Sequence, residues 1–224
     1  MDAEVNFGGV SYIVQRLIKD GIIPEIFVVG IAYQGEQSED DYYSFRCRDL
    51  TPTVDKAFMK GHQQMKDGAG GAENFAKFIE LELFPFITEK YKVKNESRSL
   101  YGHSFGGLFG FYVLLNRPQM FDKYLLLSPS LWWDANAILK DAKKYIAETK
   151  ASKLYVGTGE LENSKQHGTN QSMVDQHLEM VDLMKGKKPD SLIIKSEIIE
   201  NETHRTIFGT GFTKGLRFIY SKEI

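Results

Sequence analysis

The sequence lacks most of what several classes of protein require. Its 224 residues include one cysteine, Cys47, so no disulfide can form within the chain, and this fits a reducing compartment. The formal net charge of −2 argues against a nucleic-acid-binding surface or a polybasic membrane patch. No apolar run is long enough to cross a bilayer, and residues 1–9 have neither region of a secretory signal. We therefore expect a cytoplasmic protein without nucleic-acid or membrane partners.

Metal-binding and phosphate-binding patterns are also missing. The chain has no His-x-x-x-His or Cys-x-x-Cys spacing and no compact cluster of histidines and carboxylates. The run 68–71 is rich in glycine, but no Lys-Ser or Lys-Thr pair follows it. We therefore expect no metal and no other cofactor.

The residues that are present suit one globular domain. Hydrophobic residues make up 42% of the chain, which is enough for one sizeable core over residues 1–224. Strand-like segments alternate with helical ones, which predicts the α/β class with a mostly parallel sheet and helices on both faces. The predicted strands are 26–32, one ending at 101, 124–127, one beginning at 152, and 191–199; the predicted helices are 11–19, 74–91 (capped by Asn74 and kinked at Pro85), 107–115, 135–150, 173–184 and 211–220.

A serine between two glycines lies where a short apolar strand meets a helix. Residues 102–106 read Gly-His-Ser-Phe-Gly, the G-x-S-x-G pattern of a nucleophile elbow. A side chain at Gly102 or Gly106 is expected to collide with neighbouring backbone, so the tight turn needs glycine there. Ser104 then points outward at a helix N-terminus, where the N–H of Phe105 can stabilise an oxyanion. Ser104 is the predicted catalytic nucleophile.

A catalytic serine needs a base and an acid that orients the base. In the α/β-hydrolase order these follow the serine as Asp or Glu and then His. Glu160 and Glu162 follow the strand that begins at 152, and His204 follows the strand 191–199. Because catalytic groups in such sheets gather at the carboxyl ends of strands, we predict His204 as the base and either carboxylate as the acid.

The other histidines have simpler explanations. His177 falls in the predicted helix 173–184, where we expect a surface or half-buried position. His62 and His167 lie in polar loops and are expected to be solvated. His103 lies inside the elbow, where local packing is expected rather than proton relay, and it is counted among the candidate substrate contacts.

Five segments together resemble the putative-esterase family of α/β-hydrolases. The chain is most similar to the branch of siderophore trilactone esterases and esterase D-like carboxylesterases, and more distantly to S-formylglutathione hydrolase and feruloyl esterases. The segments are Tyr-Gly-His-Ser-Phe-Gly-Gly-Leu at 101–108, Leu-Ser-Pro-Ser-Leu-Trp-Trp-Asp at 127–134, Arg-Cys-Arg-Asp-Leu-Thr-Pro at 46–52, Gly-Gly-Ala-Glu-Asn-Phe at 70–75 and His-Arg-Thr-Ile-Phe at 204–208.

This resemblance implies further features. In the family the acid follows a glycine as G-x-x-E or G-x-x-D, which matches residues 159–162 and favours Glu162. The family carries about three strands before the segment that opens here, so the resemblance implies an N-terminally truncated α/β-hydrolase fold with Met1–Ala3 as the tail of the third strand. The second oxyanion donor is then expected at Ala3. A second copy of the chain could fill the missing place in the sheet, so a homo-oligomer is possible.

Two further pairs are candidate substrate contacts. Arg46 and Arg48 are expected in a loop, either in a surface salt bridge or as a clamp for an anionic or catecholate substrate. Trp132 and Trp133 come just after a strand and are expected either to pack in the core or to form an aromatic pocket wall.

The sequence thus favours a serine carboxylic-ester hydrolase that acts on a small-molecule ester through an acyl-enzyme. The resemblance adds siderophore-type trilactones and small acyl esters as substrates. Two alternatives stay open: an acyltransferase with the same triad, and a catalytically inactive binding module on a hydrolase scaffold.

Overall fold

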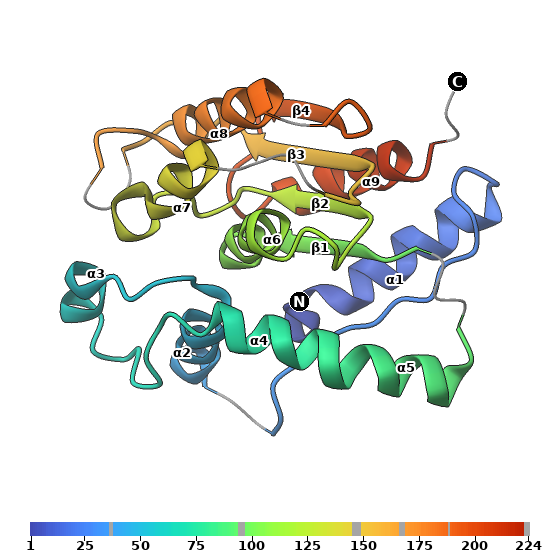
Figure 1. The fold of residues 1–224 in the computed structure, drawn as a ribbon, viewed down its shortest axis with the longest axis horizontal. Helices are drawn as coiled ribbons and strands as arrows, with labels where there is room; N and C mark the ends of the chain where they lie inside the picture. Colours follow the sequence, from blue (N-terminus) through green and yellow to red (C-terminus); the bar gives the residue numbers. More distant parts are fainter. Residues whose placement is uncertain (36–37, 94–96, 145–148, 166–168, 188, 222–224) are drawn as a thin grey trace.

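The computed structural model describes residues 1–35, 38–93, 97–144, 149–165, 169–187 and 189–221. The described strands form one parallel four-stranded sheet in the order β1 (Ser99–His103), β2 (Lys123–Leu127), β3 (Lys153–Gly159) and β4 (Ile193–Ile199) (Figure 1). In the pairing, His103 lies beside Leu127, and Leu127 lies beside Gly157. The α/β class with a mostly parallel sheet is confirmed.

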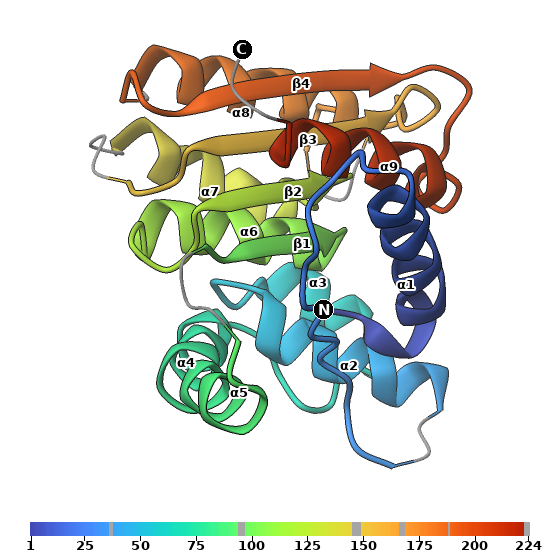
Figure 2. The ribbon, with the colours of Figure 1, turned by 90° about the vertical axis from the view of Figure 1, so that its right-hand side faces the viewer.

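Helices cover both faces of this sheet. On one face lie α6 (Phe105–Asn116), α7 (Trp133–Lys144) and α8 (Met173–Lys187), and on the other lie α1 (Ala3–Lys19) and α9 (Ile207–Ile219) (Figure 2). Alternate residues of β2 supply two separate apolar clusters, Leu126 one and Leu125 the other. The central strands β2 and β3 are therefore buried on both sides, which explains the apolar runs in their sequences.

A further group of helices lies beyond the β1 edge of the sheet (Figure 1). It comprises α2 (Glu39–Leu50), α3 (Lys56–Gly61), α4 (Ala72–Phe78), the π-helical segment η1 (Ile79–Leu83) and α5 (Phe84–Tyr91). The last three form one rod that begins after Gly71, not at Asn74 as predicted. Pro85 has no N–H to donate to the carbonyl of Leu81, and the wider π turn before it accommodates the missing bond.

The predicted strand 26–32 is wrong. The segment forms no strand, and Phe27 is 53% exposed. It packs across α1 instead: a Cβ on Gly30 would lie 2.6 Å from Cδ2 of Phe7, and the carbonyl of Ile31 accepts a hydrogen bond from the N–H of Ala3 at 3.2 Å. An apolar run alone does not distinguish a strand from an extended segment on a helix. Ala3 begins α1, so Met1–Ala3 is not a strand end either.

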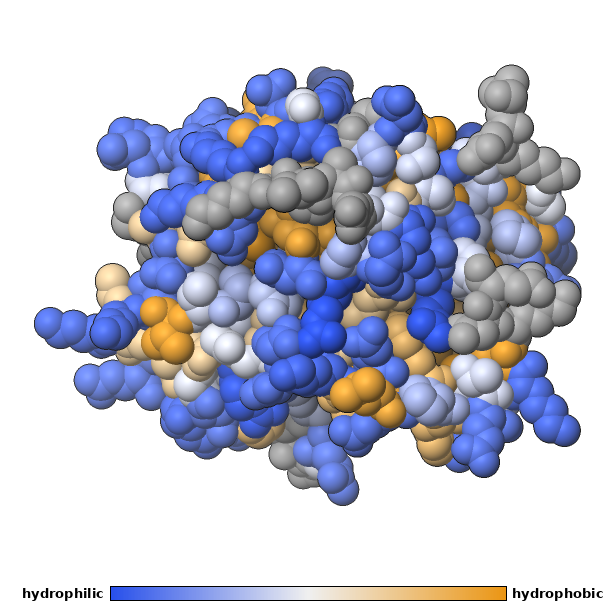
Figure 3. Space-filling view, in the orientation of Figure 1, coloured by the Kyte–Doolittle hydropathy of each residue, from blue (hydrophilic) through white to orange (hydrophobic). Residues whose placement is uncertain are grey.

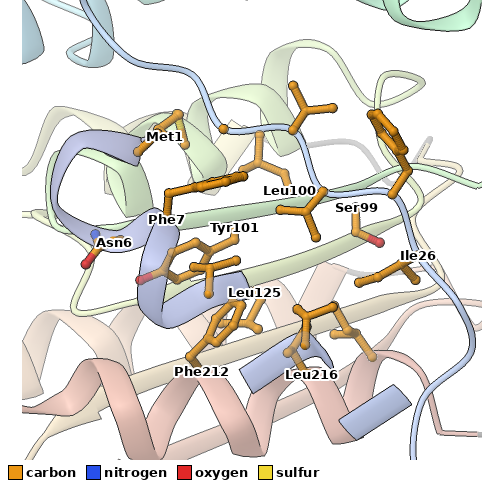
Figure 4. Close-up of a pocket in the computed structure, with 18 of the residues that line it drawn as sticks. Met1, Asn6, Phe7, Ile26, Ser99, Leu100, Tyr101, Leu125, Phe212 and Leu216 are labelled. Atoms are coloured by element: carbon orange, nitrogen blue, oxygen red, sulfur yellow. The ribbon is translucent and has the colours of Figure 1, made fainter. Parts of the chain in front are cut away.

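A cavity of about 140 Å³ lies between the segment 26–30 and β1 (Figure 4). Its walls come from this segment, β1, α1 and α9, and include Phe7, Tyr101 and Phe212. The hydroxyl of Tyr101 is buried and has no hydrogen-bond partner in the described part of the chain. Ser104 is not among the residues that line the cavity, which is therefore separate from the elbow.

The surface drawn in Figure 3 is mainly hydrophilic, and its hydrophobic residues form separate small areas. None of the helices in the described ranges is long and apolar enough to cross a membrane.

Arg46 and Arg48 lie on α2 and not in a loop as predicted. The helix begins at a capping box between Ser38 and Asp41, which satisfies free N–H groups at its first turn. Arg46 reaches inward to Asp2, with Nε 2.6 Å from Oδ1 and Nη2 3.1 Å from Oδ2. Both side chains are buried, so each charge is stabilised there by the opposite charge of its partner.

We expect Arg46→Met to lower the free energy of unfolding by about 3–5 kcal/mol, because it leaves the Asp2 carboxylate buried without its partner. Burial by itself raises the pKa of Asp2, but Arg46 holds it below the ordinary value. The ion pair therefore stabilises the fold above about pH 4 and loses its effect as the pH falls further. Urea unfolding at pH 7 measures the change. The double variant Asp2→Asn with Arg46→Met is the control and should lose less than Arg46→Met alone; an equal or greater loss contradicts the ion-pair explanation.

Candidate active site

The turn between β1 and α6 holds Ser104 in a strained backbone conformation. Its φ of 61° and ψ of −120° lie outside the usual regions for residues with a side chain. The turn requires Gly102, because a Cβ there would lie 2.1 Å from the carbonyl oxygen of Gly106. The expectation for Gly106 is wrong, since the atoms nearest to its added Cβ are Met1 Cε at 3.4 Å and Asp2 Oδ2 at 3.7 Å. The geometry is that of a nucleophile elbow.

The loop after β2 contacts the elbow through Ser130. The backbone N–H of Ser130 donates to the carbonyl oxygen of Ser104 at 3.1 Å, and the two hydroxyl oxygens lie 3.3 Å apart. In the described part of the chain, Ser104 makes no hydrogen bond to His204. Among the described residues the Ser104 hydroxyl is paired with Ser130 instead.

The loops after β3 and β4 bring a carboxylate and an imidazole together. Nδ1 of His204 lies 2.6 Å from Oε2 of Glu162. The other oxygen, Oε1, accepts hydrogen bonds from the Ser128 hydroxyl at 2.6 Å and the Gly159 N–H at 2.8 Å. Burial by itself raises the pKa of Glu162, but these bonds and His204 hold it below the ordinary value. The carboxylate is thus ionised and fixed in orientation, as a residue that orients an imidazole needs to be.

The structure distinguishes the two carboxylates that the sequence left open. Glu160 is exposed, and its Oε2 accepts a hydrogen bond from the backbone N–H of Asn201 at 3.1 Å. Glu162, which the family pattern favoured, is the one against His204.

Ser128 and Ser130 lie within one of the segments that resemble the family, but no role was predicted for them. Ser128 is fully buried and has a positive φ of 40°, which turns its hydroxyl toward Glu162. Their position directly after a buried parallel strand could have identified them as site residues, because Glu162 and His204 were predicted from the same kind of position.

Three other histidines were considered in the sequence. His177 is fully buried between Thr158 and Ser196, so the expected surface or half-buried position is wrong; burial lowers its pKa to about 4. His62 stacks on the ring of Phe58 with a centroid distance of 3.9 Å. His167 lies outside the described residues.

His103 lies against His204. Its Nε2 is 2.8 Å from the carbonyl oxygen of His204, and the two ring centroids are 4.7 Å apart. This position fits the prediction of local packing, and the role of His103 as a substrate contact stays a prediction.

The two predicted oxyanion donors differ in their surroundings. Phe105 is the first residue of α6, where the backbone N–H has no partner within the helix. The prediction for Ala3 is corrected, because its N–H donates to the carbonyl of Ile31 at 3.2 Å. Ala3 begins a helix that the segment 26–32 crosses, and this contact takes up the donor.

The two arginines differ in their surroundings, whereas both tryptophans are buried. Arg46 is buried in its ion pair with Asp2, while Arg48 forms a two-pronged salt bridge to Asp49 at 2.7 Å for both contacts. Trp133 is 1% exposed and donates from Nε1 to the carbonyl of Thr53 at 3.0 Å, so it belongs to the core. Trp132 is also buried and packs beside Phe105, at a centroid distance of 6.0 Å.

Within the described ranges, no group of three or more His, Cys, Asp or Glu side chains could hold a metal ion.

The pattern of the family described as "Putative esterase" matches residues 4–188. The chain belongs to this family. It is similar to ferri-bacillibactin esterase BesA from Bacillus subtilis, with 35% identity over 176 residues that cover 72% of the chain and 58% of BesA. It is also similar to the siderophore triacetylfusarinine C esterase from Aspergillus fumigatus, with 29% identity, covering 87% of the chain and 70% of that protein.

Solved esterase-family structures share the fold. The BES protein from Bacillus cereus matches with a TM-score of 0.78 and 28% identity, covering 99% of this chain and 81% of that one. The siderophore hydrolase EstB from Aspergillus nidulans matches with a TM-score of 0.79 and 27% identity, covering 98% and 80%. These matches confirm an α/β-hydrolase-like fold of the siderophore esterase branch.

We expect Gly102→Ala and Gly106→Ala to differ sharply in stability. Gly102→Ala forces a Cβ into backbone and should cost about 1–3 kcal/mol or more. Gly106→Ala adds a methyl group in helical backbone at ordinary contact distances and should be neutral or stabilising by up to about 1 kcal/mol. Thermal and urea unfolding of both variants measure this. Equal losses would show that the elbow does not depend on the close approach at Gly102.

Proposed function

We propose that this protein is a serine hydrolase that cleaves carboxylic esters through an acyl-enzyme, with Ser104 as nucleophile, His204 as base and Glu162 as acid. The observation that carries the proposal is the 2.6 Å contact between Glu162 and His204, on loops beside a strained serine elbow. Membership of the esterase family supports the reaction class.

The steps follow from this arrangement. The Ser104 hydroxyl turns from Ser130 to His204 Nε2, which takes its proton as the oxygen attacks the ester carbonyl. The carbonyl oxygen becomes an oxyanion, for which the N–H of Phe105 is a donor at the positive end of α6. The imidazolium, held by Glu162, returns the proton to the leaving alkoxide. Water activated by His204 then hydrolyses the acyl-enzyme and restores Ser104.

The substrate class we propose comprises siderophore-type trilactones and small acyl esters. Its support is that two relatives of the chain are siderophore esterases. A trilactone is a ring of carboxylic esters, so the same chemistry opens it. The relevant assays are a series of p-nitrophenyl esters beside a ferric catecholate trilactone.

Ser104→Ala, His204→Ala and the double variant should all fall to about the same residual rate on a p-nitrophenyl ester, because the two side chains act as a unit. A fluorophosphonate probe should label the wild-type protein at Ser104 and label none of these variants. Losses that multiply in the double variant would contradict the shared role. No labelling of the wild type would indicate an inactive binding module.

Glu162→Gln should lower kcat by about 10³–10⁴-fold, because a neutral amide stabilises the wrong tautomer of His204. Glu160→Gln is the matched control and should cost about tenfold or less, since among the described residues the Glu160 carboxylate bonds to the loop backbone at Asn201 and not to an imidazole. Steady-state kinetics on the same ester compare the two. The reverse ranking would move the acid role to Glu160.

A further inference from the structure

The proposed nucleophile directly follows a strand, whereas the proposed base lies on a loop. Ser104 follows a buried strand, whereas the His204 side chain is 38% exposed on the loop after β4. Glu162 holds the imidazole at Nδ1. That contact sets the orientation of the ring, but the position of Nε2 relative to Ser104 also depends on where the loop backbone lies. Misplacement by about 1 Å can cost about a hundredfold in rate.

His103 contacts that backbone directly. Its Nε2 is 2.8 Å from the carbonyl oxygen of His204. A carbonyl oxygen can only accept, so Nε2 carries the proton and donates. The contact therefore links the elbow strand to the loop of the base.

His103 is itself firmly held. Its backbone lies in β1 beside Leu127, and its carbonyl oxygen lies 3.4 Å from Nη2 of Arg46. Burial, and next the neighbouring His204, lower the pKa of His103 to about 4, so the ring is neutral at pH 7. The other charges near it, Arg46 and Asp2, pair with each other. The ring is thus a fixed hydrogen-bond donor.

We infer that His103 is a positioning residue whose Nε2–H holds the backbone of His204 at the place from which its imidazole reaches Ser104. This inference rests on the proposed function of the Ser104 site. His103 is bonded directly to Ser104 in the chain, so one dipeptide presents the nucleophile and sets the position of its base.

Three variants test the donor separately from the volume of the side chain. His103→Gln places an amide N–H the same number of bonds from Cβ as Nε2 of histidine. His103→Asn places it at the position of Nδ1, one bond short, and His103→Leu has no donor. Each variant is compared with the wild type in kcat, KM and thermal unfolding on a p-nitrophenyl ester.

We expect Asn and Leu at this position to lower kcat about tenfold to a hundredfold with little change in KM, and Gln to restore most of the rate. A role in stability alone would lower Tm without this split between kcat and KM and without rescue by Gln. A kcat in His103→Leu equal to that of the wild type, or a Gln variant as impaired as the Leu variant, would overturn the inference.

Proton NMR provides a readout that does not depend on ester hydrolysis. The Nδ1 proton of His204, hydrogen-bonded to Glu162, should give a downfield signal that persists in His103→Gln and broadens or disappears in His103→Leu. If the wild type neither hydrolyses esters nor reacts with the fluorophosphonate, the proposed function fails while this signal still tests the positioning. If activity is present and the signal is unchanged in His103→Leu, only the positioning role fails.

Discussion

The site depends on the in-register pairing of the parallel strands. His103, Leu127 and Gly157 lie side by side in β1, β2 and β3, so these strands reach the same edge of the sheet within a few residues of one another. The turn after β1 presents Ser104, and the loop after β3 presents Glu162. A shift of one residue would move a whole strand's side chains to the opposite face, and burial on both faces makes such a shift costly. The ladder therefore sets the relative positions of the loops that carry the candidate site.

Hydrogen bonds from neighbouring loops then refine that geometry. The loop after β2 contacts both ends of the site: Ser128 donates to Glu162, and Ser130 contacts Ser104. A buried carboxylate without such donors would become protonated and could not orient an imidazolium. This arrangement strains the backbone, because both Ser104 and Ser128 have positive φ values. Strain of this kind persists only where the surrounding structure holds it, and here the packed sheet does so.

The features predicted correctly were those with a local cause. The elbow around Ser104 follows from glycine spacing between an apolar strand and a helix, and the buried strands show their character in continuous apolar runs. The errors have one cause in common. The run 26–32 is as apolar as a strand but packs across α1, and Arg46 looks like a surface cation but lies in a buried ion pair. In both cases the partner is distant in the sequence, so no local pattern reports it.

The sequence by itself determined the α/β class, the elbow and the positions of the proposed nucleophile and base, because these depend on residue type, spacing and the order of strands. It did not choose by spacing between Glu160 and Glu162, since both lie in the same loop. Only the tertiary structure separated them, by placing Glu162 under the donors Ser128 and Gly159 and turning Glu160 outward. It also decided that the N–H of Ala3 is occupied by Ile31. The bonds from Ser128 to Glu162 and from Ala3 to Ile31 join segments far apart in the chain, so their geometry exists only in the folded protein.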